Sequence, residues 1–203
     1  MSFKQNGYEV VRNAISNELL EHLKIEFEMF KEIKFYKHKE TNLYAFGDEQ
    51  SPNSFSIYSL LCFESLAIQL RDSISKITQK NLYPTYSFAR IYYNGAILKP
   101  HTDRPSCEYS TTICIDTTDM WNFHIKDRIG NENVVKLNPG DMCVYSGCEL
   151  EHWRDPYTGT QQIQCFLHYV DSNGPFKNFK YDKRPMLGIV SSMDNTKDNF
   201  NYF

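Results

Sequence analysis

Three residues in two separate segments could together bind a metal ion. His101 and Asp103 lie two positions apart, so on an extended chain their side chains leave the same face of the strand. His152 lies in a later segment and would complete a set of two imidazoles and one carboxylate if the segments face each other. Such a facial triad binds ferrous iron and leaves coordination positions open. We therefore expect a redox-active metal centre at these residues.

Each candidate ligand also has an ordinary structural interpretation. His101 and Asp103 could be a polar pair in a surface turn, and His152 could be a half-buried histidine bonded to the backbone. A lone His-x-Asp pair is common enough by chance that the surrounding motifs have to decide between these interpretations.

The composition is that of a folded protein with a sizeable core. Its 203 residues suit one domain, and 41% of them are hydrophobic and 15% aromatic. The net charge of −3 comes from 22 basic and 25 acidic residues without long blocks of one sign. This balance argues against binding to nucleic acid or to an anionic membrane surface.

The sequence indicates a soluble, cytoplasmic protein with reduced cysteines. Its first residues lack the apolar core of a signal peptide, and no apolar run approaches the length of a membrane span. The six cysteines show no Cys-x-x-Cys spacing. We interpret them as small hydrophobic residues rather than as disulfide partners or zinc ligands.

The first part of the chain is predicted to be mainly helical. A short strand over 7–15 precedes a helix that Ser16 or Asn17 can cap, with apolar residues at helical spacing: Leu19, Leu20, Leu23, Phe27 and Phe30. Residues 37–54 are polar and are interpreted as a loop that could close over a site. A second helical region is expected over 54–79, broken near its middle at Ser65.

The chain after Pro84 is predicted to form short strands separated by turns. The expected strands cover 85–93, 109–116, 122–125, 134–137, 142–145, 150–154 and 162–170. Strands at this spacing are typical of a sandwich or barrel, and helices before strands give an α+β arrangement. We expect one domain over 1–203, with helical support over about 1–80, a β core over about 84–171 and an irregular tail over about 173–203.

The motifs around the candidate ligands form an ordered set. In chain order they are Tyr93-Asn94-Gly95, Leu98-Lys99-Pro100-His101-Thr102-Asp103, Ser110-Thr111-Thr112, Trp121, Leu137-Asn138-Pro139-Gly140-Asp141, and Gly147 ahead of His152. With this order and spacing, the chain resembles the Fe(II)- and 2-oxoglutarate-dependent dioxygenases, most closely their prolyl-hydroxylase-like branch. The resemblance covers about 84–171 and is weak over the helical N-terminus.

The resemblance implies both a fold and a chemistry. The fold would be a double-stranded β-helix, or jelly roll, buttressed by N-terminal helices, with Fe(II) bound by His101, Asp103 and His152. The enzyme would consume 2-oxoglutarate and dioxygen, hydroxylate an unactivated C–H bond, and release succinate and carbon dioxide, with ascorbate as a reductant. A peptidyl proline is the leading substrate and a small molecule the alternative, because a fold does not determine its substrate.

The chain departs from the family where the far carboxylate of 2-oxoglutarate is bound. The family has an Arg or Lys there, and in this chain the position falls on Gln161 or Gln162. Glutamine can donate a hydrogen bond to a carboxylate but cannot neutralise it. Another cation must therefore supply the charge.

We expect Arg154 to supply this charge, because it lies two positions beyond His152 and faces the same way on a strand. Arg90 and Arg104 are the alternatives, and Arg154 could instead form an ion pair with Glu151 or Asp155. The resemblance and strand alternation also assign four uncharged residues to the co-substrate pocket: Tyr93, Thr112, Gln162 and Gln164.

Two other functions fit the same residues. A metal-binding jelly roll without 2-oxoglutarate turnover would explain the missing basic residue. An interaction module that binds a protein through its aromatic surface would make the histidines and the aspartate incidental, and it predicts no bound first-row metal.

Overall fold

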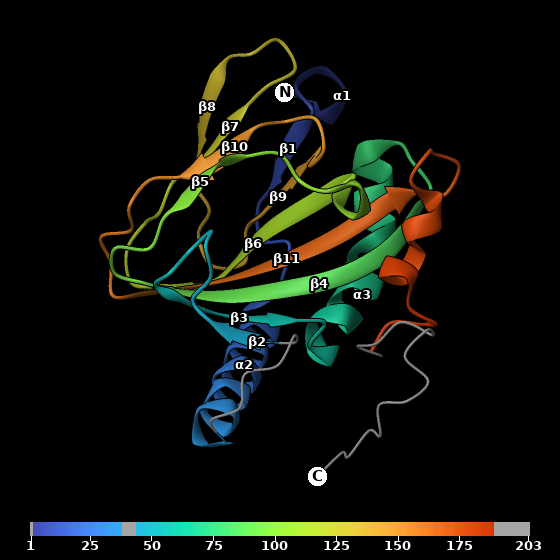
Figure 1. Cartoon of the computed structure of the whole chain (residues 1–203). Helices are drawn as coiled ribbons and strands as arrows, with labels where there is room; N and C mark the ends of the chain where they lie inside the picture. The colour runs from blue at the N-terminus through green and yellow to red at the C-terminus, as the bar shows by residue number, and fades with distance from the viewer. Residues whose placement is uncertain (1, 38–43, 189–203) are drawn as a thin grey trace.

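The structure, a computed structural model, describes residues 2–37 and 44–188. Its strands form two antiparallel sheets that face each other (Figure 1). The larger sheet contains seven strands, β1 (Tyr8–Val11), β9 (Met142–Tyr145), β6 (Tyr109–Thr117), β11 (Gln161–Asp171), β4 (Leu82–Tyr93), β3 (Ser54–Tyr58) and β2 (Tyr44–Phe46), in that spatial order. The smaller sheet contains four strands, β5 (Leu98–His101), β10 (His152–Arg154), β7 (Phe123–Lys126) and β8 (Glu132–Val135).

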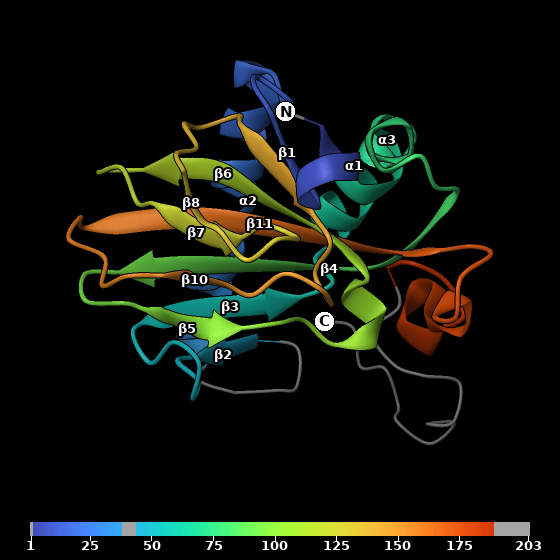
Figure 2. The same ribbon diagram turned by 90° about the horizontal axis from the view of Figure 1, so that it is seen from above.

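The strands of the β core alternate between the two sheets. From β4 to β11 the chain crosses from one sheet to the other at every connection except the β7–β8 hairpin. This winding is a jelly roll, so the predicted fold class is confirmed. Figure 2 shows the smaller sheet lying across the larger one.

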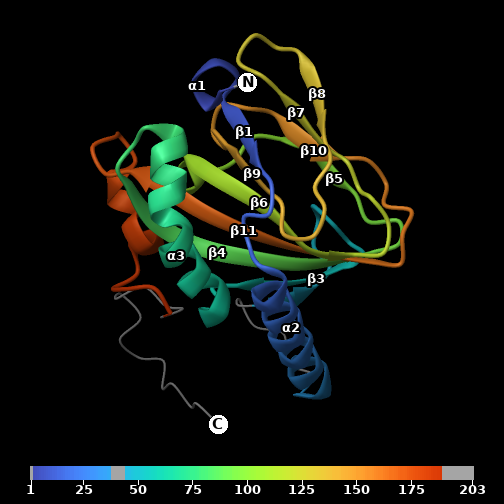
Figure 3. The same ribbon diagram turned by 180° about the vertical axis from the view of Figure 1, so that it is seen from behind.

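Two helices cover the outer face of the larger sheet, α2 (Asn17–Lys37) and α3 (Leu61–Thr78), as Figure 3 shows. The odd-numbered residues of β11 pack with these helices in one buried apolar cluster, to which they contribute Ile163, Cys165, Leu167 and Tyr169. Because side chains alternate along a strand, the even-numbered residues of β11 face the smaller sheet. This alternation decides which side chains can reach a site between the sheets.

The region between the first long helix and β4 differs from the prediction. Residues 44–46 and 54–58 were expected in a loop and a helix, but they form strands β2 and β3. Segment 54–58 alternates between polar and apolar residues, and Phe55 and Ile57 pair with Ile91 and Ala89 of β4. Residues 38–43 lie outside the described part of the chain.

Helix α3 is continuous through Ser65, where a break was expected. The Ser65 hydroxyl donates a hydrogen bond to the Leu61 carbonyl one turn earlier, so this serine is satisfied within the helix. Within residues 2–37 and 44–188, no helix combines the length and the apolar composition needed to cross a membrane.

Short helices lie at three places around the sheets: α1 (Phe3–Asn6), η1 (Pro105–Cys107) and η2 (Lys177–Lys183). After η2 the chain is fixed to α3 by a buried ion pair, in which Arg184 Nη2 lies 2.7 Å from Glu64 Oε1. Arg184 also donates to the Thr85 carbonyl at the start of β4. The part of the predicted irregular tail that precedes residue 189 is therefore packed against the protein.

Candidate active site

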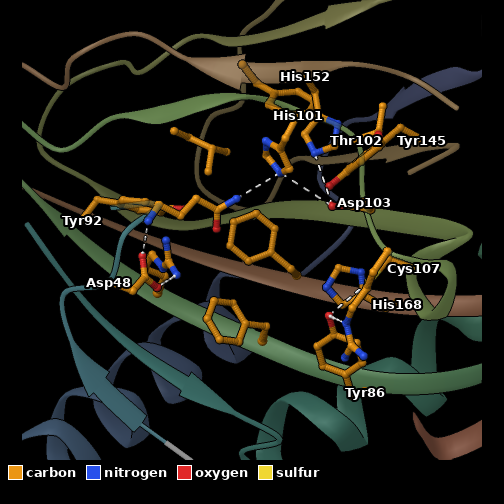
Figure 4. Close-up of a pocket in the computed structure, with 17 residues that line it drawn as sticks. Asp48, Tyr86, Tyr92, His101, Thr102, Asp103, Cys107, Tyr145, His152 and His168 are labelled. Atoms are coloured by element: carbon orange, nitrogen blue, oxygen red, sulfur yellow. Dashed lines mark hydrogen bonds and ion pairs between the residues drawn. The ribbon is translucent and has the colours of Figure 1, made fainter. Parts of the chain in front are cut away.

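The three candidate ligands converge between the sheets. His101 ends β5 and His152 begins β10, and the two residues are direct partners across these strands. Oδ1 of Asp103 lies 3.7 Å from His101 Nε2 and 3.6 Å from His152 Nε2. Figure 4 shows the three side chains turned toward one another. One ligand atom from each lies within 4.8 Å of the others, a separation that one metal ion can bridge.

Backbone hydrogen bonds fix the orientation of both imidazoles. His101 Nδ1 lies 2.7 Å from the Lys99 carbonyl, and His152 Nδ1 lies 2.8 Å from the Leu150 carbonyl. A carbonyl only accepts, so each Nδ1 carries the proton and each Nε2 presents a lone pair toward Asp103. This is the tautomer that a metal-binding histidine requires.

Burial sets the charge of the triad. It lowers the pKa of His152 to about 4 and, together with the neighbouring His152, lowers the pKa of His101. Burial raises the pKa of the Asp103 carboxyl to about 6, against a hydrogen bond from Ser110 that lowers it. Two neutral imidazoles and a desolvated carboxylate leave a site that lacks positive charge, which a divalent cation would supply.

The triad lies beside a cavity of about 390 Å³. Its floor is aromatic and comes from the inward faces of β4 and β11, where Phe88 pairs with Phe166 in the strand register. Tyr86 and His168 continue this floor, with ring centroids 4.5 Å apart. The cavity is therefore large enough to hold a small organic molecule next to the three candidate ligands.

Unpartnered hydrogen-bond donors gather at inward-facing positions of three strands. Among the described residues, Arg90 Nε and Nη1, Arg154 Nε and Gln164 Nε2 are buried without a hydrogen-bond partner. Gln164 pairs with Arg90 in the register of β11 and β4. Thr112 connects Gln164 to Arg154, because its hydroxyl donates to Gln164 Oε1 at 3.0 Å and lies 3.5 Å from Arg154 Nη2. Buried donors without partners call for an acceptor, such as an ordered water, an ion or a ligand that carries oxygens.

Arg154 is a buried cation without an acidic partner in the described part of the chain. Its side chain is 2% exposed, and burial lowers the pKa of its guanidinium. Nη1 donates to the Trp121 carbonyl at 2.7 Å, and the guanidinium lies over the rings of Trp121 and Phe123. The acidic neighbours that could have paired with it, Glu151 and Asp155, instead contact Lys126 and His124. No carboxylate among the described residues therefore compensates the charge of Arg154.

The two alternative arginines have acidic partners. Arg90 lines the cavity, lies over the Phe88 ring and pairs with Asp48 from the β2–β3 turn. Arg104 pairs with Asp182 at 2.8 Å and lies over the Tyr86 ring. Arg90 nevertheless keeps two nitrogens, Nε and Nη1, without a hydrogen-bond partner among the described residues, whereas Arg104 lies at the Tyr86 end of the cavity.

The β2–β3 turn reaches the triad as well. Gln50 Nε2 lies 3.3 Å from His101 Nε2. Since Nδ1 of this imidazole carries the proton, the Gln50 amide donates to the lone pair that would otherwise bind a metal ion. The sequence assigned Asp48 and Gln50 to a loop, and nothing in their local pattern points to these contacts.

Of the residues expected in the co-substrate pocket, Arg90 lines the cavity, whereas the others are not among its lining residues: Arg154, Thr112, Gln162, Gln164 and Tyr93. Tyr93 packs against the cluster between the helices and the larger sheet, whereas Tyr92 lines the cavity. Gln162 is buried on β11 and accepts a hydrogen bond from Thr117. Tyr92 could have been found by alternation, because it continues the even-numbered face of Tyr86 and Phe88.

Solved structures share this fold. No protein-family model and no curated protein matches the chain. A prolyl-4-hydroxylase from Pseudomonas putida matches with a TM-score of 0.63 and 14% identity, over 83% of this chain and 95% of that chain. The α-ketoglutarate-dependent epimerase SnoN from nogalamycin biosynthesis matches with a TM-score of 0.68 and 11% identity, over 84% and 80%. HygX from Streptomyces hygroscopicus, with nickel and 2-oxoglutarate bound, matches with a TM-score of 0.64 and 12% identity, over 84% and 85%.

The chain has the fold of the Fe(II)- and 2-oxoglutarate-dependent oxygenases. This confirms, at the level of the fold, the resemblance noted in the sequence. A prolyl-hydroxylase is among the structures that share the fold. Structures with the fold carry out different reactions, since hydroxylation and epimerisation are both represented. The substrate of this chain has to be argued from its own residues.

Proposed function

We propose that this protein is an oxygenase that binds Fe(II) at His101, Asp103 and His152 and consumes 2-oxoglutarate. The observation that carries the proposal is the convergence of three ligand atoms within 4.8 Å, beside buried donors that have no partner among the described residues. When bound, iron and 2-oxoglutarate would together supply the activation of dioxygen, with succinate and carbon dioxide as products.

The ligand atoms suit a divalent first-row metal with open positions. Two imidazole nitrogens and one carboxylate oxygen are ligands that suit iron, whereas structural zinc is usually bound by thiolates. Cys107 lies close to Asp103, but burial raises the pKa of its thiol to about 12. We therefore assign the metal to the two histidines and the aspartate.

The donor cluster, formed by Arg90, Arg154 and Gln164, suits the far carboxylate of 2-oxoglutarate. Arg154 would neutralise it, with Arg90 and Gln164 as further hydrogen-bond donors, while the Thr112 hydroxyl holds the Gln164 amide through Oε1. Arg154 lies two residues beyond His152 on β10, so a dicarboxylate that reaches from the metal along this strand ends at the cluster. The rings of Phe88 and Phe166 would cover its carbon chain and exclude water.

A peptidyl proline is our first candidate for the substrate, and its support is the motif resemblance to the prolyl-hydroxylase-like branch. A small molecule is the second candidate, supported by the variety of reactions among proteins of this fold. Hydroxylation of a C–H bond is the reaction we assign in both cases.

Binding measurements test the proposal directly. Calorimetry with Mn(II), a redox-inert substitute for Fe(II), should show one site per chain, and 2-oxoglutarate should bind only to the metal-loaded protein. His101→Ala should abolish both signals, whereas His22→Ala, on the exposed face of α2, should leave them unchanged. Metal binding without 2-oxoglutarate binding would favour a non-catalytic jelly roll, and absence of metal binding would favour an interaction module.

Turnover provides the second test. The protein with Fe(II), ascorbate and dioxygen should convert 2-oxoglutarate to succinate, and His152→Ala should abolish this conversion. Peptides that contain proline should accelerate it if the first substrate candidate is right. Acceleration by small cyclic metabolites alone would exclude the peptide.

A further inference from the structure

The two oxygens of the Asp103 carboxylate have different surroundings. Oδ1 faces the Nε2 atoms of His101 and His152 at 3.7 and 3.6 Å. Oδ2 accepts a hydrogen bond of 2.9 Å from the hydroxyl of Ser110 on β6. One oxygen is therefore presented to the metal-binding point while the other is held by the protein.

Ser110 connects Asp103 to His168. Its Oγ lies 2.9 Å from Asp103 Oδ2, 3.1 Å from the Cys107 carbonyl and 2.9 Å from His168 Nδ1. A hydroxyl has one proton to donate, and the carboxylate and the carbonyl can only accept. His168 Nδ1 must then donate to Ser110, which gives a directed chain from His168 through Ser110 to Asp103.

Packing fixes both ends of this chain of hydrogen bonds. His168 is 5% exposed, and its ring centroid lies 4.5 Å from that of Tyr86. The backbone N–H of Asp103 donates to the Gly147 carbonyl at 2.8 Å. A Cβ atom on Gly147 would overlap Asp103 Oδ2 and Ser110 Oγ, so the absence of a side chain at this position leaves room for the contact.

We propose that Ser110 and His168 are positioning residues that hold Asp103 with only Oδ1 available to the metal. This inference rests on the proposed metal site. Without the hydrogen bond to Oδ2, the carboxylate could rotate and present both oxygens, which would use a position needed by the co-substrate. Residues that orient a metal ligand in this way commonly contribute about 10- to 100-fold to metal affinity.

The first test compares Mn(II) affinity by electron paramagnetic resonance in three proteins. Ser110→Ala should bind Mn(II) about 10- to 100-fold more weakly than the unaltered chain, and its spectrum should change because the ligand geometry changes. Ser87→Ala is the control. This variant removes a buried hydroxyl that has no hydrogen-bond partner among the described residues and lies on the face of β4 away from the cavity. The Mn(II) affinity of Ser87→Ala should therefore be unchanged.

The second test separates the hydrogen bond from the packing of His168. His168→Phe keeps a ring against Tyr86 but removes the donor, and it should weaken Mn(II) binding to the same extent as Ser110→Ala. His168→Asn loses the ring but keeps an N–H group near the position of Nδ1, and it should retain most of the affinity. A weak Asn variant together with a normal Phe variant would overturn the hydrogen-bond chain.

The outcomes distinguish this inference from the proposed function. An unaltered chain that binds no Mn(II) would refute the metal site itself. Normal metal binding with an equal affinity in Ser110→Ala would refute only the positioning role. Circular dichroism on each variant establishes that the fold is retained before affinities are compared.

Discussion

Arg154 brings a positive charge into the interior without an acidic partner in the described part of the chain. Removing an ion from water costs several kcal/mol even after relaxation. The hydrogen bond to the Trp121 carbonyl and the adjacent rings offset only part of this cost. We therefore expect the ligand-free protein to be at least as stable with an uncharged side chain at this position.

Arg154→Met should separate stability from ligand binding. We expect its thermal unfolding without ligands to be unchanged or shifted upward, because the buried charge is removed. Binding of 2-oxoglutarate to the Mn(II)-loaded variant should weaken about 10- to 150-fold, as the loss of a charge-assisted hydrogen bond worth about 1.5–3 kcal/mol predicts. Calorimetry and circular dichroism measure the two quantities.

A matched control is Arg71→Met on the exposed face of α3, where Arg71 pairs with Asp72. It should change neither quantity, since exposed ion pairs contribute little. If Arg154→Met unfolds at a lower temperature and still binds 2-oxoglutarate normally, the guanidinium is structural and the co-substrate is bound elsewhere.

The turn between β2 and β3 occupies atoms that the proposed ligands would need. Gln50 donates to the lone pair of His101 Nε2, and Asp48 pairs with Arg90 of the donor cluster. A metal ion and the Gln50 amide cannot use the same lone pair. The turn must therefore release His101 when a metal binds.

Gln50→Ala should consequently tighten metal binding. A hydrogen bond worth about 0.5–1.5 kcal/mol no longer has to be broken, which corresponds to about 2- to 13-fold in affinity. Mn(II) calorimetry measures the change, with the exposed neighbour variant Glu49→Ala as control. Weaker binding in Gln50→Ala would mean that the glutamine assists the metal site.

Asp141 joins the connection between β1 and α2 to the turn before β9. Burial alone would raise the pKa of its carboxyl, but hydrogen bonds from the Arg12 side chain and from the backbone N–H groups of Asn13 and Asn138 bring the pKa below its ordinary value. A lowered pKa means that the folded state favours the charged form. The resulting stability is present above the unfolded-state pKa of about 3.9 and is lost as the pH falls below it.

Asp141→Asn should therefore be destabilising only where Asp141 is ionised. At pH 7 we expect a loss of about 1–2 kcal/mol in the free energy of unfolding. The difference from the unaltered chain should shrink as the pH falls below about 4. Urea denaturation at pH 7 and below about pH 4 measures the free energy of unfolding of both proteins. A difference that does not depend on pH would assign the effect to side-chain packing rather than to charge.

The sequence predicts best the elements that depend on local pattern. The two-residue spacing of His101 and Asp103 and the strand alternation around them predict a shared face, and the structure brings both residues together with His152. Strands β2 and β3 were missed because β3 pairs with β4, which lies beyond α3 in the chain, and β2 pairs in turn with β3. The sequence named the members of the donor cluster, Arg154, Arg90 and Gln164, but not their arrangement, which depends on the register between Arg90 and Gln164 across two strands.

At the scale of the whole molecule, the ion pair between Glu64 and Arg184 fixes the C-terminal segment to α3 and β4. Glu64 is 1% exposed and Arg184 is 6% exposed. Breaking a buried pair from one side leaves a desolvated charge, which typically costs about 3–5 kcal/mol. The segment after η2 therefore contributes to the stability of the entire fold.

Arg184→Met should lower the free energy of unfolding by about 3–5 kcal/mol. The double variant Glu64→Gln with Arg184→Met should recover much of this loss, because no charge is left buried. Guanidinium denaturation followed by circular dichroism measures both variants. Equal losses in the single and double variants would show that packing of the Arg184 side chain matters more than its charge.

The position of Trp121 gives the protein an optical reporter of its own. The chain has two tryptophans. The Trp121 ring lies 5.0 Å from the Arg154 guanidinium, whereas Trp153 stacks on His124, on the face of β10 away from His152. An anion that attracts the guanidinium will alter the fluorescence of Trp121. In a Trp153→Phe background, emission from this single indole would follow the arrival of 2-oxoglutarate in real time, without any added dye.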